Sequence, residues 1–235
     1  GVTTGVKVGD RVMAMVVPKG THGAYREQIV LNQRAVVAAP ARSSHAEACT
    51  LPMNALTARM SLDLLDLEPG QVIAVTGGPG AYGGYVIQLA KADGLMVIAD
   101  AADSDRELLK ALGADIVVSR GDGFTDKIRE HFPQGVDGLA DGALLNARAV
   151  DAVKDGGSFT AIRGFKGEDQ RDIKFTATWV TGYDGAYEKL DLLREQVEGG
   201  ALTLRVAGSV TPEDAGLAHQ RLEQGGTRGR MVIEF

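Results

Sequence analysis

Short apolar runs alternate with longer amphipathic segments along the middle of the chain, and this pattern predicts alternating strands and helices. The expected strands are Gln71–Thr76, Leu95–Ala99, Ile116–Val118, Val136–Ala140 and Ser158–Ile162. The expected helices are Gly83–Ala92, Ser104–Leu112, Thr125–Phe132 and Leu144–Val153. Apolar strands that are joined by helices form a parallel sheet with both faces covered, and right-handed crossovers make the sheet doubly wound. The pattern therefore predicts an α/β fold with a doubly wound parallel sheet.

The two ends of the chain have a different pattern. Before residue 41, short alternating runs predict an antiparallel β piece with strands at Arg11–Val17, Glu27–Leu31 and Val36–Ala39. Ser44 and Glu47 have the spacing of a capping box, and after an interruption at Pro52 the spacing predicts a helix over Asn54–Leu67. After residue 170 we expect a helix, a strand, a helix and a strand, at Gly185–Val197, Leu202–Val210, Pro212–Leu222 and Met231–Phe235.

Composition limits the classes of function that the chain can have. The 235 residues include 25 Lys and Arg against 31 Asp and Glu, a net charge of −6 that argues against a nucleic-acid surface. The single cysteine excludes an internal disulfide and fits a reducing compartment, so we expect a cytoplasmic protein. No apolar run is long enough to span a membrane, and residues 1–10 lack the regions of a signal peptide.

The most informative segment follows the first strand of the predicted parallel sheet. It has the pattern G-x-G-x-x-G and consists of Gly78, Pro79, Gly80, Ala81, Tyr82 and Gly83. We expect Gly78 to allow a tight turn, Gly80 to let a pyrophosphate approach the backbone, and Gly83 to let the helix pack closely on the strand. The N–H groups at the start of that helix would face the phosphates. This context predicts a dinucleotide site of the Rossmann type.

An acidic residue follows at the distance that such a site requires. Asp100 comes twenty residues after Gly80, at the end of the next strand, where a carboxylate accepts hydrogen bonds from the adenosine ribose. Asp103 and Asp105 add negative charge, and the nearby cations Arg106 and Arg120 are outweighed. We therefore favour NAD(H), with NADP(H) as the alternative. The structural alternative is a glycine-rich turn beside an ordinary surface aspartate.

Several motifs together resemble one enzyme family. Their order and spacing are those of the medium-chain dehydrogenase/reductase superfamily, in particular its zinc-independent quinone oxidoreductase-like branch. The matching segments are Gly5–Val12, Gly23–Tyr25, Leu51–Ala58, Pro69–Lys91, Leu112–Asp115, Val136–Asp141, Gly156–Ser158 and Leu217–Ile233.

The resemblance implies a domain organisation. Residues 1–45 and 185–235 would form a partial GroES-like substrate domain, and residues 46–184 the Rossmann domain. The first strands of the GroES-like domain would be missing, and with them the positions where relatives carry the first zinc ligands or a tyrosine that assists hydride transfer. The catalytic residues therefore stay unassigned.

Candidate ligands for zinc are scattered, and we expect no metal site. His22, His45, His131 and His219 form no pair at the spacing of zinc ligands. We expect His219 to be structural and Cys49 to be a small buried hydrophobic residue.

Further candidates lie toward the nicotinamide end of the predicted cofactor. By resemblance, Asn54 and Thr57 pass near the nicotinamide phosphate, although Asn54 could instead cap a helix. Asp141 and the segment Ile162, Arg163 and Gly164 follow parallel strands, where ligands bind, and the main chain of that segment could contact the carboxamide. Tyr82 could contact the pyrophosphate or pack. Trp179 and Tyr183 are expected in the core rather than in a pocket.

The resemblance implies an oxidoreductase that transfers hydride between nicotinamide and a quinone or an α,β-unsaturated carbonyl without zinc. The alternative is a dinucleotide-binding module without turnover, or a truncated remnant. We expect a small-molecule carbonyl or quinone substrate, no nucleic-acid or membrane partner, and a homodimer.

Overall fold

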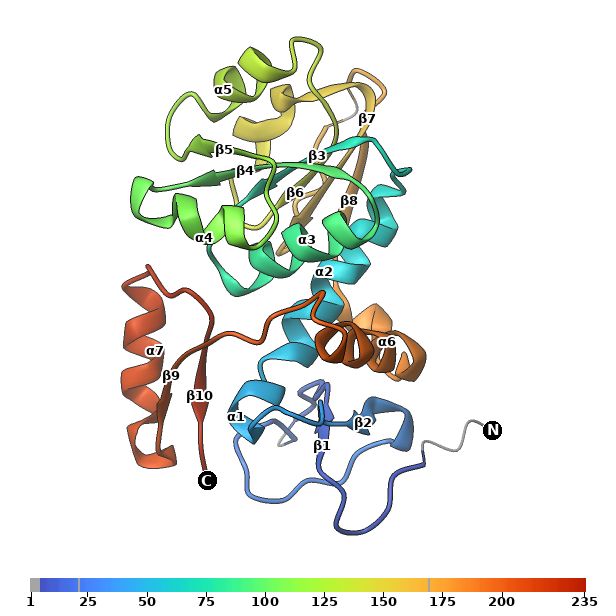
Figure 1. Ribbon diagram of the computed structural model, residues 1–235, viewed down its shortest axis with the longest axis vertical. Coiled ribbons are helices and arrows are strands. Elements are labelled where there is room, and N and C mark those ends of the chain that lie inside the picture. Colours follow the sequence, from blue (N-terminus) through green and yellow to red (C-terminus); the bar gives the residue numbers. More distant parts are fainter. Residues whose placement is uncertain (1–4, 21, 169) are drawn as a thin grey trace. The chain divides into compact units, whose positions relative to one another are not determined.

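A six-stranded parallel sheet organises the middle of the chain (Figure 1). The computed structural model describes residues 5–20, 22–168 and 170–235. The strand order is β5-β4-β3-β6-β7-β8, and all five neighbouring pairs are parallel. The strands are β3 (Val72–Thr76), β4 (Met96–Ala101), β5 (Ile116–Ser119), β6 (Val136–Asp141), β7 (Val153–Ile162) and β8 (Lys174–Thr178). Because the order reverses between β3 and β6, the prediction of a doubly wound sheet is confirmed.

Helices cover both faces of this sheet (Figure 1). On one face lie α3 (Ala81–Ala92) and α4 (Arg106–Ala111), the latter preceded by the short 3₁₀ helix η2 (Asp103–Asp105). On the other face lie α5 (Phe124–His131) and η3 (Asn146–Ala152). The helix predicted over Leu144–Val153 is present as the 3₁₀ helix η3. Strand β8 was not predicted at all.

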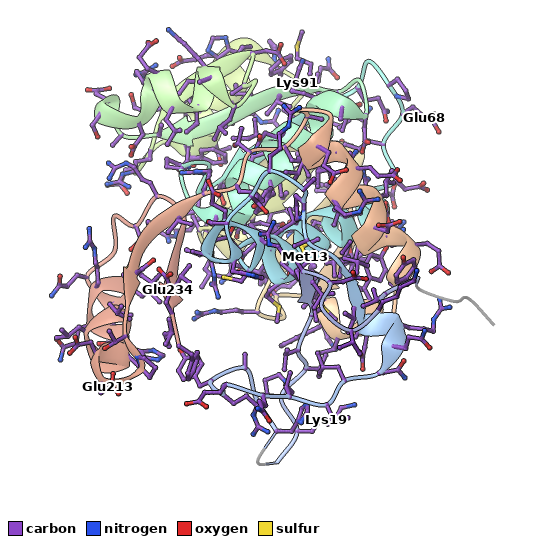
Figure 2. All side chains as sticks on the ribbon, turned by 60° about the horizontal axis from the view of Figure 1, so that its bottom comes forward. Met13, Lys19, Glu68, Lys91, Glu213 and Glu234 are labelled. Carbon is purple, nitrogen blue, oxygen red and sulfur yellow. The ribbon has the colours of Figure 1, made fainter. Side chains whose placement is uncertain are left out.

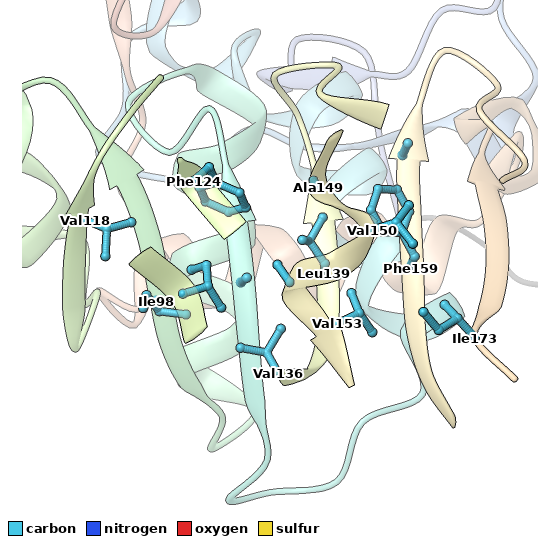
Figure 3. Close-up of a cluster of buried hydrophobic side chains, with 14 residues drawn as sticks. Ile98, Val118, Phe124, Val136, Leu139, Ala149, Val150, Val153, Phe159 and Ile173 are labelled. Atoms are coloured by element: carbon cyan, nitrogen blue, oxygen red, sulfur yellow. The ribbon is translucent and has the colours of Figure 1, made fainter. Parts of the chain in front are cut away.

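The core between the sheet and the helices α5 and η3 is apolar (Figure 3). Leu139 from β6 and Phe159 from β7 are fully buried there beside Phe124 and Ile128 of α5. Each fully buried side chain of this size stabilises the fold by roughly 1.5–3 kcal/mol. The strands that pack in this core carry the loops of the candidate site at their carboxyl ends.

Contacts divide the chain into two units, one made of Gly1–Leu56 with Val180–Phe235 and the other of Thr57–Trp179. The boundary of the first unit therefore falls inside helix α2 (Leu51–Leu65), beyond the boundary expected at residue 45. Pro52 does not interrupt this helix, because it lies in the first turn, where a proline is tolerated. The second boundary lies just after the end of β8.

The first unit contains two small sheets. Strands β1 (Val12–Ala14) and β2 (Val36–Ala38) pair antiparallel, as expected, and β9 (Val206–Val210) pairs parallel with β10 (Arg230–Ile233). The strand predicted at Glu27–Leu31 was wrong, because that segment has no regular structure. The helical elements are η1 (Gln33–Ala35), α1 (His45–Ala48), η4 (Val180–Tyr183), α6 (Tyr187–Glu198), η5 (Pro212–Asp214) and α7 (Ala215–Glu223).

Local hydrogen bonds fix the element ends. The capping box is confirmed at α1, where Glu47 N donates to Ser44 Oγ and Ser44 N donates to Glu47 Oε2. Lys91, labelled in Figure 2, donates from Nζ to Asp115 at 2.8 Å, and so ties α3 to the start of β5. Among the described residues, no helix is long and apolar enough to cross a membrane.

Candidate functional site

The loop between β3 and α3 makes a tight turn, and its left-handed residue is Gly77. Gly77 has φ 70°, which favours glycine, whereas the sequence had suggested Gly78 as the residue that allows the turn. Gly80 N donates to Gly77 O at 3.0 Å and closes the turn. The correction moves the turn one residue towards β3 and leaves the start of α3 where it was expected.

The remaining glycines of the loop have different neighbours. A Cβ on Gly83 would lie 2.8 Å from the carbonyl carbon of Gly77 and closer still to its oxygen, so Gly83 has the predicted close-packing role. A Cβ on Gly78 would lie 2.9 Å from Leu109 Cδ2 of α4. Packing therefore requires a glycine at position 83, where the neighbours are backbone atoms, whereas at Gly78 the neighbour is the end of a flexible side chain.

Gly80 differs, because packing alone does not require a glycine there. It is the N-cap of α3, with φ −66° and ψ 169°, a conformation open to any residue. A Cβ would meet one atom only, Gly77 O at 3.2 Å. Gly80 stands at the positive end of a twelve-residue helix, where backbone N–H groups can bind a phosphate. The loop thus fits the diphosphate of a dinucleotide.

Asp100 lies next to this loop in a buried position. Its Oδ1 accepts a hydrogen bond from Gly77 N at 2.7 Å, and the residue is only 5% exposed. Burial raises the pKa of Asp100, and hydrogen bonds from Gly77 and Gly78 and the charge of Arg120 oppose that rise only in part. The carboxylate therefore anchors the glycine loop as well as standing at the end of β4, where a ribose would lie.

The two cations near Asp100 are not equivalent. Arg106 donates to Val117 O at 2.8 Å, to Ser119 Oγ and to Asp103, so its guanidinium is engaged by the protein. Arg120 is exposed, and its backbone N donates to Ala101 O beside the end of β4. Of these two cations, Arg120 is therefore the one that is open to a ligand at the carboxyl end of β4.

Asp141 is part of the protein's own framework. It is fully buried, and its carboxylate accepts hydrogen bonds from Thr76 Oγ1 at 2.5 Å and from Asn146 N at 2.7 Å. It also accepts from the N–H groups of Ala143 and Leu145. The side chain therefore organises the turn after β6, and only this turn, not the carboxylate, can face a ligand.

Tyr82 also packs rather than facing the loop. It is 8% exposed, and its hydroxyl lies 2.7 Å from Ser61 Oγ of α2. A Cβ on Gly142 would lie 2.7 Å from Tyr82 Cδ1, so the ring covers the backbone of the turn after β6. Burial raises the pKa of this phenol, which keeps it protonated. Of the two roles considered for Tyr82, the structure supports packing.

The carboxyl end of β7 has a strained backbone. Arg163 has φ 61° and Gly164 has φ 87°. Arg163 is exposed, and a left-handed conformation is uncommon for an arginine. A Cβ on Gly164 would lie 2.9 Å from Trp179 Cζ2, so the indole lies against this turn. Trp179 is 57% exposed, and the expectation of a core position was wrong for this residue.

Three other residues lie elsewhere. Asn54 and Thr57 are one turn apart within α2, Asn54 in the first unit and Thr57 in the second. Because α2 begins at Leu51, Asn54 is not its N-cap; its Nδ2 is buried, without a hydrogen-bond partner in the described part of the chain. Tyr183 lies in the first unit, half-buried, with Lys189 Nζ 4.8 Å from its ring centre.

The described residues contain no group of three His, Cys, Asp or Glu side chains that could hold a metal ion. His219 bonds instead to Tyr25, with 2.9 Å between its Nε2 and the phenol oxygen. Cys49 is exposed, so the expectation of a buried cysteine was wrong. A zinc ion does not fit the side chains of the described residues.

Comparisons with known proteins relate this chain to a family of dehydrogenases and reductases. A family model described as zinc-binding dehydrogenase matches residues 81–195. The 2-methylene-furan-3-one reductase of Solanum lycopersicum is 33% identical over 68% of this chain and 42% of its own length. The quinone-oxidoreductase QR1 of Triphysaria versicolor is 36% identical over 48% of this chain and 36% of its own length. The chain thus spans less than half the length of these two curated relatives.

A solved structure shares the fold along nearly the whole chain. The mycobacterial protein Rv1454c, complexed with NADPH, is 25% identical and superimposes with a TM-score of 0.83. The match covers 98% of this chain and 75% of that one.

Some parts of the site had no signal in the sequence. Ser61 and Thr178 were not candidates, yet their hydroxyls lie 2.9 Å apart beside Tyr82. They are 117 residues apart in the chain, and no local pattern relates them. The role of Gly77 did have a signal, because the chain has two consecutive glycines after β3.

Proposed function

Because this chain belongs to the medium-chain dehydrogenase/reductase superfamily, we propose that it is an NAD(P)H-dependent oxidoreductase acting on a quinone or an α,β-unsaturated carbonyl. The observation that carries the proposal is Gly80, a glycine that packing within the protein does not require and that stands at the positive end of α3. The names of the reductase and the quinone oxidoreductase among its relatives support the substrate class.

The cofactor would lie along the carboxyl ends of the strands. The N–H groups at the start of α3 would bind its diphosphate, and Asp100 its adenosine ribose. The turn after β6 and the main chain of Ile162–Gly164 would line the nicotinamide half. When bound, the nicotinamide ring supplies the hydride. The residues of this chain would hold and orient the cofactor, and we assign no side chain as proton donor.

We propose NAD(H) as the favoured cofactor. The buried carboxylate of Asp100 accepts hydrogen bonds from ribose hydroxyls and repels a 2′-phosphate. Arg120 is the exposed cation beside it and would support residual binding of NADP(H). We also propose a homodimer, which light scattering on the purified protein would test.

Turnover assays test the proposal. NADH or NADPH would be mixed with the protein and a benzoquinone, a naphthoquinone or an open-chain enone, with the corresponding saturated ketone as the control acceptor. We expect loss of nicotinamide absorbance with at least one quinone or enone and none with the saturated ketone. Cofactor binding without oxidation of any member of the panel would contradict the enzyme and favour a non-catalytic binding module.

A further inference from the structure

Four buried hydroxyl groups form a connected chain inside the second unit. They come from Ser61 of α2, Tyr82 of α3, Thr160 of β7 and Thr178 of β8, and all four residues are buried. Ser61 Oγ lies 2.7 Å from the Tyr82 hydroxyl and 2.9 Å from Thr178 Oγ1. Thr178 Oγ1 lies 2.7 Å from Thr160 Oγ1. This chain of hydroxyl groups thus connects helix α3, which begins at the glycine loop, with the ends of strands β7 and β8.

The direction of each hydrogen bond follows from counting protons. Ser61 Oγ donates to the carbonyl oxygen of Thr57 at 3.0 Å, and a carbonyl can only accept. A hydroxyl has one proton and two lone pairs, so Ser61 must accept from both Tyr82 and Thr178. Thr178 donates its single proton to Ser61, so Thr160 must donate in the hydrogen bond between Thr160 and Thr178. Tyr82 therefore donates its phenol proton to Ser61.

The ring of Tyr82 connects two loops of the candidate site. It belongs to the first turn of α3, directly after the glycine loop, and it packs on the backbone of Gly142 in the turn after β6. Thr178 is the last residue of β8, and Thr160 lies two residues before the end of β7. The same side chain therefore contacts the turn after β6 directly and the ends of β7 and β8 through Ser61.

We propose that Tyr82 is a positioning residue, which through Ser61 and Thr178 holds the nicotinamide half of the site at a fixed distance from the diphosphate half. This proposal rests on the proposed function, because it requires a cofactor that spans both halves. A ligand bound by the diphosphate end alone should not depend on this spacing. Tyr82 is not a proton donor to substrate, since its proton is held by Ser61 in a buried place.

The test compares two ligands on the Tyr82→Phe variant, which keeps the ring and removes the hydroxyl. ADP-ribose lacks the nicotinamide ring, whereas NADH has it. We expect Tyr82→Phe to weaken NADH binding by roughly 3- to 10-fold, the effect of one lost hydrogen bond, and to leave ADP-ribose binding unchanged. Calorimetric titration gives both dissociation constants. The matched control is Tyr85→Phe, one turn further along α3 and outside the hydroxyl chain, which should change neither.

A second variant makes the test independent of the folding of the first. Ser61→Ala removes the acceptor of the same hydrogen bond, so it should lower the ratio of NADH to ADP-ribose affinity in the same way. The double variant should lose no more than either single variant, because both changes break one connection.

The outcomes separate the two proposals. Equal weakening of both ligands, or no weakening of either, would overturn the positioning role and leave the proposed function intact. A wild-type protein that binds neither ligand would overturn both.

Discussion

A charged carboxylate inside a protein costs stability unless its hydrogen bonds compensate for lost water, and Asp100 is in that position. Burial raises its pKa, while the N–H groups of Gly77 and Gly78 and the Arg120 guanidinium compensate in part. A buried carboxyl group with a raised pKa beside a glycine loop is typical of a binding site. Its two roles, as anchor for Gly77 and as the expected ribose ligand, must be separated by the choice of variant.

The Asp100→Asn variant makes this separation, because the amide oxygen can still accept from Gly77 N while the charge is removed. A raised carboxyl pKa in the folded state means that stability falls as the pH rises from the ordinary aspartate pKa through the raised one. The Asp100→Asn variant has no carboxyl group at this position, so its free energy of unfolding lacks this fall. We therefore expect its free energy of unfolding, relative to the wild type, to increase over that pH window and to stay constant above it.

Urea unfolding at a series of pH values measures this difference. A difference between variant and wild type that does not change with pH would contradict a raised pKa. The same variant should show a reduced preference for NADH over NADPH in binding.

At the scale of elements, the proposed diphosphate site consists of helix α3 and the glycine loop that precedes it. The structure gives Gly83 a packing role, and we propose that Gly80 faces the ligand. A Cβ added at Gly83 would have backbone atoms of Gly77 and Gly78 within 3 Å, whereas one added at Gly80 would meet Gly77 O alone, at 3.2 Å. The two positions should therefore respond differently to the same substitution.

We expect Gly83→Ala to lower the free energy of unfolding by about 1–3 kcal/mol, because the backbone must move to admit the methyl group. Gly80→Ala should fold with nearly the stability of the wild type but bind NADH roughly tenfold or more weakly, because its methyl group occupies the phosphate space. Thermal unfolding and calorimetric titration of both variants check this. Wild-type affinity in Gly80→Ala would show that no phosphate approaches this residue.

How far the sequence determines these elements depends on the range of the contacts. The strands β3, β4 and β6 and the helix α3 were predictable, because their apolar runs are continuous and the glycines mark the turn. Strand β8 was missed, because Lys174–Thr178 has few large apolar residues and lies beside β7 only after a long loop. Asp141 was placed correctly at a strand end, but its inward orientation depends on Thr76 and on the turn that follows it, which no spacing reveals.

At the scale of the whole molecule, the proposed function requires a nucleotide that lies across the strand ends of the second unit. Trp179, the single tryptophan of the chain, lies at the end of β8 against Gly164. It is therefore an internal reporter for the nicotinamide half of that site.

The most direct measurement is a titration of the protein with NADH, with excitation of Trp179 and detection of both tryptophan and nucleotide emission. We expect a saturable loss of tryptophan emission and a matching gain of nucleotide emission, with one nucleotide bound per chain. Emission that changes only in proportion to the added nucleotide, without saturation, would contradict it.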